Sequence, residues 1–402
     1  MGLIRKHRSH HGFHALGRIG RIGKLSGVDL FISLAAAMVN TIWAVYLYSF
    51  LQSNVAVGFF SALLTVVGFF SYFLFIPLME KADKGKIYFY AGIMYFISYL
   101  LFAINRNVYV LLGLAIITTV LISIKVTCFG IIVRDSSEKN NLSKNEGIVY
   151  TFFNLAYVIG PLLAGYLTTY FDTSIIFYVA AGFIIIGLVL FKSAKIEDKG
   201  GKKKIDKSMI KNFFDFFRSK DRIVAYLLGA GVSVWWMLIY LFVPLWMLES
   251  GFQEFHIGYF MFAVAIPLIL FEYLFSRMTN KKGFKKMFLM GHIILAVIAV
   301  VCFFMTNDLA ILGLLVLASC GIAMTEPTTE AYFLDILRGK EQYRFYGPYN
   351  TALDVGSFIG KIAGSVTLIF LPFKFIFLVI GGIMFLLFLL SFRVRKIIEA
   401  KR

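Results

Sequence analysis

Charged residues and cysteine are both scarce in this chain of 402 residues. Asp, Glu, Lys and Arg make up 15% of the sequence and hydrophobic residues 59%, whereas a soluble domain has about 25% and 45–50%. This shortage of charge excludes a water-soluble fold. The three cysteines all lie inside apolar runs, which excludes a disulfide framework. The first apolar run lacks a small-residue cleavage site, so we expect no cleaved signal peptide.

Apolar runs of twenty or more residues recur along the whole sequence. Every backbone amide must be paired in hydrocarbon, so only helices and closed barrels span a bilayer. Barrel strands would read as alternating segments of about 10 residues, whereas these runs are continuously apolar. We therefore predict an all-α integral membrane protein with twelve transmembrane helices. Their predicted ranges are 28–50, 55–79, 87–104, 108–133, 148–170, 175–193, 223–248, 255–278, 287–305, 309–334, 347–371 and 373–392.

The positions of Lys and Arg predict the orientation. Of the 40 such residues, 36 lie in alternate loops and the two terminal segments, and the opposite loops hold only Arg106 and Lys374. The positive-inside rule then places both termini in the cytoplasm, with the protein in the cell membrane. This asymmetry also explains the net charge of +18. We expect anionic lipid, and no nucleic acid, at the basic face.

A charged segment, 194–222, divides the predicted helices six and six. Within it, 210–218 could lie as an amphipathic helix on the membrane surface, or the whole segment could be a flexible connection. The sequence leaves both interpretations open. The predicted parts are a basic arm over 1–27, a six-helix bundle over 28–193, a cytoplasmic linker over 194–222, a second bundle over 223–392 and a basic tail over 393–402.

The two halves of the chain are related by a duplication. A shift of about 200 residues superposes residues at loop edges that chance would not match in so apolar a sequence. These pairs include Gly58 with Gly258, Asp135 with Asp335, and Gly147 with Gly347. Each repeat has six helices, an even number, so both copies start on the same side of the membrane. They therefore have the same orientation and are related by an axis along the membrane normal.

Two basic loops at equivalent places carry a related motif. Residues 276–286 (SRMTNKKGFKK) keep the spacing of the pattern G-x-x-x-D-R-x-G-R-K, with Ser for the first Gly and Asn for Asp. Residues 79–86 (MEKADKGK) keep the acid and the basic residues but are one residue short before the glycine. With this motif, the duplication and the topology, the chain resembles the major facilitator superfamily over essentially its whole length. The resemblance implies a secondary transporter with cytoplasmic gating loops at Asp83, Gly85, Asn280 and Gly283.

The fifth predicted helix holds Gly160, Pro161 and Gly165, which is similar to the Gly-Pro motif of antiporters in that family. Small residues at this spacing let helices approach closely, and proline loosens the helix backbone. The second half has Lys361 where the first has Pro161. Close packing of this kind is common in membrane proteins, so antiport and plain packing both stay open.

Charged residues inside the predicted helices are the strongest functional signal. A charge at the centre of a membrane helix costs ~2.5–3.5 kcal/mol, so each needs a reason. Five stand out: Lys125, Glu326, Glu330, Asp354 and Lys361. The resemblance implies a central cavity lined by helices 1, 4, 7 and 10 and flanked by 2, 5, 8 and 11, and all five residues fall on these helices. They either bind a solute and a proton or form static ion pairs between the halves.

The expected site combines these charges with one polar residue of the first helix. We expect the substrate-binding residues to be Lys125, Glu326, Asn40, Lys361 and Asp354, with Glu326 also the proton-coupling residue. A proton on Glu326 would leave the deep charges net positive, which favours an anionic or zwitterionic solute. Asp29 is expected at the cytoplasmic end of the first helix, away from this site.

Other function classes lack their motifs here. The sequence has no P-loop, no H-E-x-x-H and no loop long enough for a catalytic domain. We therefore expect no enzyme and no cofactor, and a monomer. A receptor on a transporter scaffold or a polytopic membrane enzyme remain alternatives. The arm holds histidines that would share one face of a helix, but its basic charge disfavours a metal, so we predict no metal site. They are His7, His10, His11 and His14.

Overall fold

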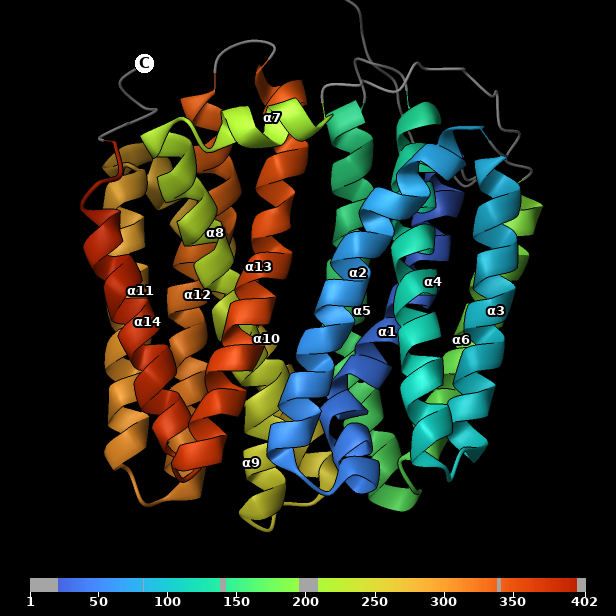
Figure 1. Ribbon diagram of the computed structural model, residues 1–402, viewed down its shortest axis with the longest axis horizontal. Coiled ribbons are helices and arrows are strands. Elements are labelled where there is room, and N and C mark those ends of the chain that lie inside the picture. The colour runs from blue at the N-terminus through green and yellow to red at the C-terminus, as the bar shows by residue number, and fades with distance from the viewer. Residues whose placement is uncertain (1–20, 82, 138–141, 195–208, 338–340, 396–402) are drawn as a thin grey trace, which may run out of the picture.

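The computed structural model describes residues 21–81, 83–137, 142–194, 209–337 and 341–395. Figure 1 shows these residues as two groups of upright helices. The first group is α1 (Arg21–Leu51), α2 (Asn54–Lys81), α3 (Lys84–Ile104), α4 (Val108–Asp135), α5 (Leu142–Tyr170) and α6 (Ser174–Ser193). A short helix, α7 (Met209–Phe216), precedes the second group. That group is α8 (Lys220–Met237), η2 (Leu238–Phe242), α9 (Val243–Glu249), α10 (Glu254–Lys282), α11 (Phe284–Phe304), α12 (Asp308–Ile336), α13 (Glu341–Phe370) and α14 (Phe375–Ser391).

The predicted fold class, twelve helices in two six-helix bundles, is confirmed. In the described part of the chain, eleven helices are long and apolar enough to cross a membrane, and Phe375–Ser391 is a shorter apolar one. Helix α8, the π-helical turn η2 and α9 run on as one spanning segment, Lys220–Glu249. Pro244 follows η2 at the start of α9. A proline has no N–H to donate to the preceding turn, which is consistent with the irregular helix there.

Helix α1 begins at Arg21 rather than near residue 28, where the apolar run starts. The cause is packing around the start of that run: Leu25 and Val28 are fully buried and form a cluster with Tyr88 of α3 and Cys128 of α4. Asp29 therefore lies two turns inside the helix. Its expected place at the end of the first helix was wrong.

Helix α7 is docked on the second bundle. Phe216 is fully buried, and its ring contacts Tyr226 and Phe345. Arg344 of α13 donates a hydrogen bond of 2.7 Å to Asn212 and forms an ion pair with Asp215. This part of the linker, Met209–Phe216, is therefore helical, and its contacts are with the second bundle; its position on the membrane surface stays a prediction. We call the end of the molecule that carries α7 the basic end, and the other the short-loop end.

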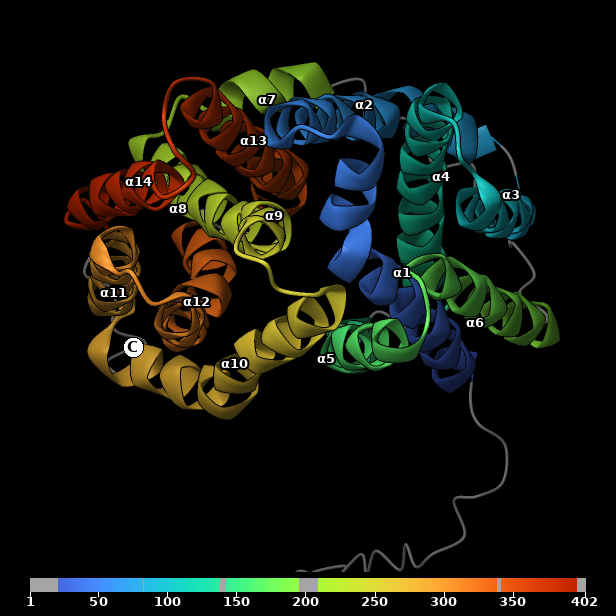
Figure 2. The same ribbon diagram turned by 90° about the horizontal axis from the view of Figure 1, so that it is seen from below.

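The duplication reappears as two equivalent contacts between the bundles, α2 with α13 and α5 with α10, which lie on opposite sides of the molecule (Figure 2). A Cβ atom at Gly58 would lie 1.9 Å from Ser365 Oγ, and one at Gly258 would lie 2.4 Å from Gly165 Cα. The glycines Gly58 and Gly258 are repeat mates, and so are Gly165 and Ser365. At Gly258 the neighbouring atoms are backbone, so that contact depends on glycine, whereas at Gly58 the neighbour is the side chain of Ser365.

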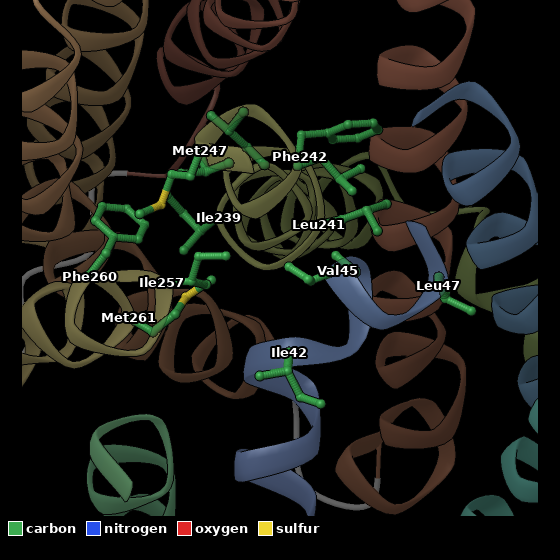
Figure 3. Close-up of a cluster of buried hydrophobic side chains, with 14 of the residues drawn as sticks. Ile42, Val45, Leu47, Ile239, Leu241, Phe242, Met247, Ile257, Phe260 and Met261 are labelled. Atoms are coloured by element: carbon green, nitrogen blue, oxygen red, sulfur yellow. The ribbon is translucent and has the colours of Figure 1, made fainter. Parts of the chain in front are cut away.

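Apolar side chains from both bundles fill the space between these two contacts, near the short-loop end. Ile42 and Val45 of α1 are buried in one cluster with Leu241 of η2 and with Ile257 and Met261 of α10, as Figure 3 shows. We call these five residues the apolar plug. Water cannot pass such a packed group, so the plug closes the short-loop end of the interface between the bundles.

We predict that Gly356→Ala destabilises the second bundle. A Cβ at this position of α13 would lie 2.1 Å from the carbonyl oxygen of Ala230 in α8, and backbone cannot move aside cheaply. Overpacking of this kind costs about 1–3 kcal/mol. Thermal unfolding of the purified protein measures it. Gly313→Ala is the matched control, since no atom lies within 4 Å there, and equal melting temperatures for the two variants would contradict the packing.

Candidate functional site

A cavity of about 870 Å³ lies between the two bundles. Its walls come from α1 to α5 on one side and from α8, η2 and α13 on the other. The lining extends from Asp29 and Gly130, toward the basic end, to Trp43 and to Leu241 of the apolar plug. The volume lies in the range of small-molecule sites, about 300–1,000 Å³.

Four charged side chains line this cavity, and their formal charges balance. Asp29 and Lys125 stand on the wall of the first bundle, and Asp354 and Lys361 on α13 of the second. Among the predicted site residues, Lys125, Lys361, Asp354 and Asn40 are brought together here. Asp29 is an addition that the sequence analysis missed. Its signal was the apolar pair Ile22 and Leu25, which extends the helix on the same face.

Lys125 is nearly sealed from solvent, with 4% of its surface exposed. Its Nζ lies 3.8 Å from the centroid of the Tyr95 ring, which is a cation–π contact. The charge of Asp29 acts on it, but no direct ion pair joins the two. Within the described residues, no hydrogen-bond acceptor contacts the Lys125 ammonium. Its three N–H donors are therefore available to a ligand.

Lys361 is engaged differently. Its Nζ donates to the Ser61 carbonyl oxygen at 3.1 Å and to Thr65 Oγ1 at 2.7 Å, both on α2 of the other bundle. Asp354 lies two turns away on α13 and acts on Lys361 electrostatically. This lysine therefore links the two bundles as well as lining the cavity.

Tyrosines form much of the remaining wall. Asn40, which faces the cavity, donates a hydrogen bond of 3.1 Å to the Tyr157 hydroxyl. The hydroxyls of Tyr95 and Tyr99 are hydrogen-bonded to each other, and Tyr240 reaches the cavity from η2. The sequence could not single these out, because aromatic residues make up 17% of the chain. Rings with one polar atom suit a pocket that binds a partly apolar molecule.

Glu326 is not among the residues that line this cavity. It accepts a hydrogen bond of 3.4 Å from Trp236 Nε1, and the charge of Glu272 in α10 acts on it. Tyr150 of α5 is subject to the charges of Glu326, Glu272 and Glu330. The structure thus groups Glu326 with other carboxylates that face α5, and not with Lys125.

The expected loop residues lie at the basic end. Asp83 caps α3 by accepting a hydrogen bond of 3.0 Å from the Lys86 amide. Gly85 follows inside α3, and Asn280 lies in the last turn of α10. Gly283 joins α10 to α11 with φ of 83°, a conformation that favours glycine. Their role as gates stays a prediction.

The motif of the fifth predicted helix makes contacts in two directions. A Cβ at Gly160 would lie 2.5 Å from Ala37 Cβ of α1, so this glycine allows α5 to pack inside its own bundle. A Cβ at Gly165 would lie 3.0 Å from the Phe255 carbonyl oxygen of α10, so that glycine faces the other bundle. Pro161 stands between them, and its carbonyl oxygen also borders Gly258.

The candidate metal ligands His7, His10, His11 and His14 lie outside the described residues. Within the described ranges, no group of three or more His, Cys, Asp or Glu side chains could hold a metal ion.

We predict that a cysteine at position 126 reacts rapidly with a charged thiol reagent. Val126 lines the cavity with 56% of its surface exposed, so water should reach it in the bilayer. Ile117 is the control: it is 48% exposed on the same helix, but it lies about half a turn around the axis and outside the lining. In a cysteine-free protein in proteoliposomes, mass spectrometry should find Val126→Cys labelled about tenfold faster. Equal rates would mean that this wall faces lipid.

Sequence comparison finds relatives over much of the chain. The Major Facilitator Superfamily matches residues 25–269 and 233–402. An uncharacterized MFS-type transporter of Methanocaldococcus jannaschii is 22% identical over 230 residues, 56% of this chain and 59% of that protein. A bicyclomycin resistance protein homolog of Haemophilus influenzae is 25% identical over 163 residues, 39% of this chain and 41% of that protein. The chain thus spans 59% and 41% of the length of these relatives.

Solved structures share the fold over nearly the whole chain. The nucleoside transporter NupG has a TM-score of 0.76 at 11% identity and covers 94% of this chain and 99% of its own. A POT family transporter in complex with 5-aminolevulinic acid has a TM-score of 0.75 at 12% identity and covers 93% and 96%. Since the family match extends over both six-helix bundles, the chain belongs to the major facilitator superfamily.

Proposed function

We propose that this protein is a secondary active transporter that moves a small solute across the cell membrane by alternating access. The observation that carries the proposal is a cavity with charged walls between two membrane-embedded bundles, closed at one end by the apolar plug. A permanent pore would be open at both ends. The basic end faces the cytoplasm on the positive-inside rule, so this is the inward-facing state. We expect the protein to work as a monomer.

The contacts at the short-loop end support this assignment, because all of them are reversible. Asn54 of α2 donates to the Glu249 carboxylate, and Thr173 donates to the Glu254 carboxylate, so both hydrogen bonds join the two bundles. Glycine contacts and the apolar plug complete the closure. To face outward, the bundles would separate here and close at the basic end. Ligand binding drives such a switch only through different affinities for the two states.

Proton coupling at Glu326 is part of the proposal. This carboxyl faces the interface with α5 and lies within electrostatic reach of Glu272. A proton taken up by one of two neighbouring carboxylates removes the repulsion between them. Because the interface with α5 changes when the bundles move, protonation can favour one state over the other.

The substrate is an anionic or zwitterionic solute held by Lys125, with Asn40, Lys361 and Asp354 shaping the rest of the site. The proposal is supported by the Lys125 ammonium, which is almost fully buried. None of its three N–H groups donates a hydrogen bond to the protein in the described part of the chain. A carboxylate or phosphate oxygen would supply the missing acceptor in a charge-assisted hydrogen bond.

We expect solute uptake into proteoliposomes to respond to an imposed pH gradient, and Glu326→Gln to abolish that response while the melting temperature stays near that of the unmodified protein. The amide keeps the shape and removes the titratable proton. Glu330→Gln is the matched control, one turn away and bound to the Tyr346 hydroxyl at 2.8 Å. Full pH-driven accumulation by Glu326→Gln would place the coupling elsewhere. Absence of any uptake would favour a receptor or an enzyme.

Two substitutions of Lys125 should distinguish the effect of its positive charge from the effect of its shape. Lys125→Ala should weaken solute binding at least tenfold, because a charge-assisted hydrogen bond contributes about 1.5–3 kcal/mol. Lys125→Arg should lose less, since it keeps the positive charge although its planar group fits differently. Thermal-shift titration with the transported solute measures both. If alanine and arginine are tolerated equally, Lys125 is structural or the solute is not anionic.

A further inference from the structure

Asp29 and Lys125 stand as opposite charges on neighbouring helices of one cavity wall. Both line the cavity, Asp29 from α1 and Lys125 from α4, and the charge of each acts on the other. Their charged atoms are nonetheless more than 4 Å apart, since no ion pair joins them in the described structure. Opposite charges at this depth normally pair directly. The space between the two charged groups therefore requires a physical reason.

The N–H groups of Lys125 indicate which kind of ligand binds between the two charged residues. Burying an ammonium without a hydrogen-bond acceptor is costly, and Lys125, which is 4% exposed and lies over the Tyr95 ring, has no such acceptor among the described residues. Thr118 lies on the same face of α4 and is 6% exposed, and its hydroxyl has no hydrogen-bond partner in the described part of the chain. The hydroxyl of Ser61, which is 3% exposed in the same lining, has none there either. These groups are arranged for a polar ligand.

The second Asp and Lys pair of the cavity does not offer the same opening. The Lys361 ammonium already donates to Ser61 and Thr65 of α2. A ligand there would have to displace two protein hydrogen bonds, whereas a ligand at Lys125 would displace none. The head group of the ligand therefore belongs in the first bundle.

The balanced formal charges of the cavity lining favour a ligand with no net charge. With two acids and two lysines in the lining, an anion or a cation would bring an uncompensated charge into a low-dielectric site. A zwitterion brings none, and its two charged groups can bind one each to Asp29 and Lys125, which are too far apart for a direct ion pair.

We propose, on the basis of the transport function above, that the substrate is a net-neutral amino-acid-like zwitterion whose carboxylate binds Lys125 and whose ammonium binds Asp29. The body of the molecule lies against the tyrosine-rich wall, which the hydroxyls of Thr118 and Ser61 also border. Asp29 is thus a substrate-binding residue.

Three probes that share one body test this directly: phenylalanine carries both charges, 3-phenylpropionate only the carboxylate, and phenethylamine only the ammonium. A second trio, leucine, 4-methylpentanoate and isopentylamine, repeats the test with a smaller body. Thermal-shift and calorimetric titrations of the unmodified protein should show at least tenfold tighter binding of a zwitterion than of either partner molecule. Preference for a singly charged probe, or no binding of either zwitterion, overturns the proposal.

Two variants should move selectivity in opposite directions. Asp29→Asn leaves Lys125 unbalanced and should shift preference at least tenfold from phenylalanine toward 3-phenylpropionate. Lys125→Gln leaves Asp29 unbalanced and should shift it toward phenethylamine. A purely structural pair would weaken all probes alike, which overturns the assignment. Asp308→Asn, an acid at the short-loop end of α12 and outside the lining, is the control that should keep zwitterion preference.

Uptake of the same radiolabelled probes into proteoliposomes separates this inference from the transport function. Zwitterion-selective binding without uptake would support the site and contradict transport. Uptake of a singly charged solute without zwitterion preference would support transport and contradict the site.

Discussion

The cost of placing a charge in hydrocarbon governs the interior of this molecule. Each buried charge must find a partner within the protein or in what the protein binds. Lys361 meets the requirement with the Ser61 carbonyl and the Thr65 hydroxyl. Lys125 has an aromatic face and a distant carboxylate, but no acceptor in the described residues. Two lysines in one cavity are therefore satisfied differently: one links the bundles, and the other is the one for which we propose a ligand.

The second constraint is that the two bundles must meet closely and still separate. The glycine contacts allow backbones to touch, so dispersion forces act over short distances without interlocking side chains. Gly58 with Ser365 and Gly258 with Gly165 repeat the same contact on the two sides of the interface. Each half of the duplicated sequence supplies one member of each repeat pair. The symmetry of the sequence is thus preserved in the contact that any relative motion of the bundles must break.

The fold could be predicted from the sequence because hydropathy, loop charge and duplication are averaged over many residues. The site was predicted less completely, because it depends on single positions. Lys125 was found as a charge within an apolar run. Asp29 was missed, since its place depends on Leu25 packing against Tyr88, which extends α1 beyond the apolar run. Glu326 was grouped with Lys125 because both lie deep in helices that the resemblance places at the cavity, but neither depth nor the choice of helix says which side of a helix faces which neighbour.

The separation of Glu326 from the cavity has a mechanistic consequence. A carboxylate beside Lys125 would compete with an anionic group for the same ammonium, and proton and solute would then exchange at one place. Here Glu326 interacts with Trp236 and Glu272 on the side of α5, while the solute site proposed above lies with Asp29 and Lys125. The Trp236 ring packs against Tyr240, which lines the cavity and on which the charge of Glu326 acts, so this pair of rings and the movement of the bundles both connect the two sites. Coupling through a shared two-state element needs no contact between the ligands, and we expect protonation and bundle movement to meet at the interface of α5 with α10.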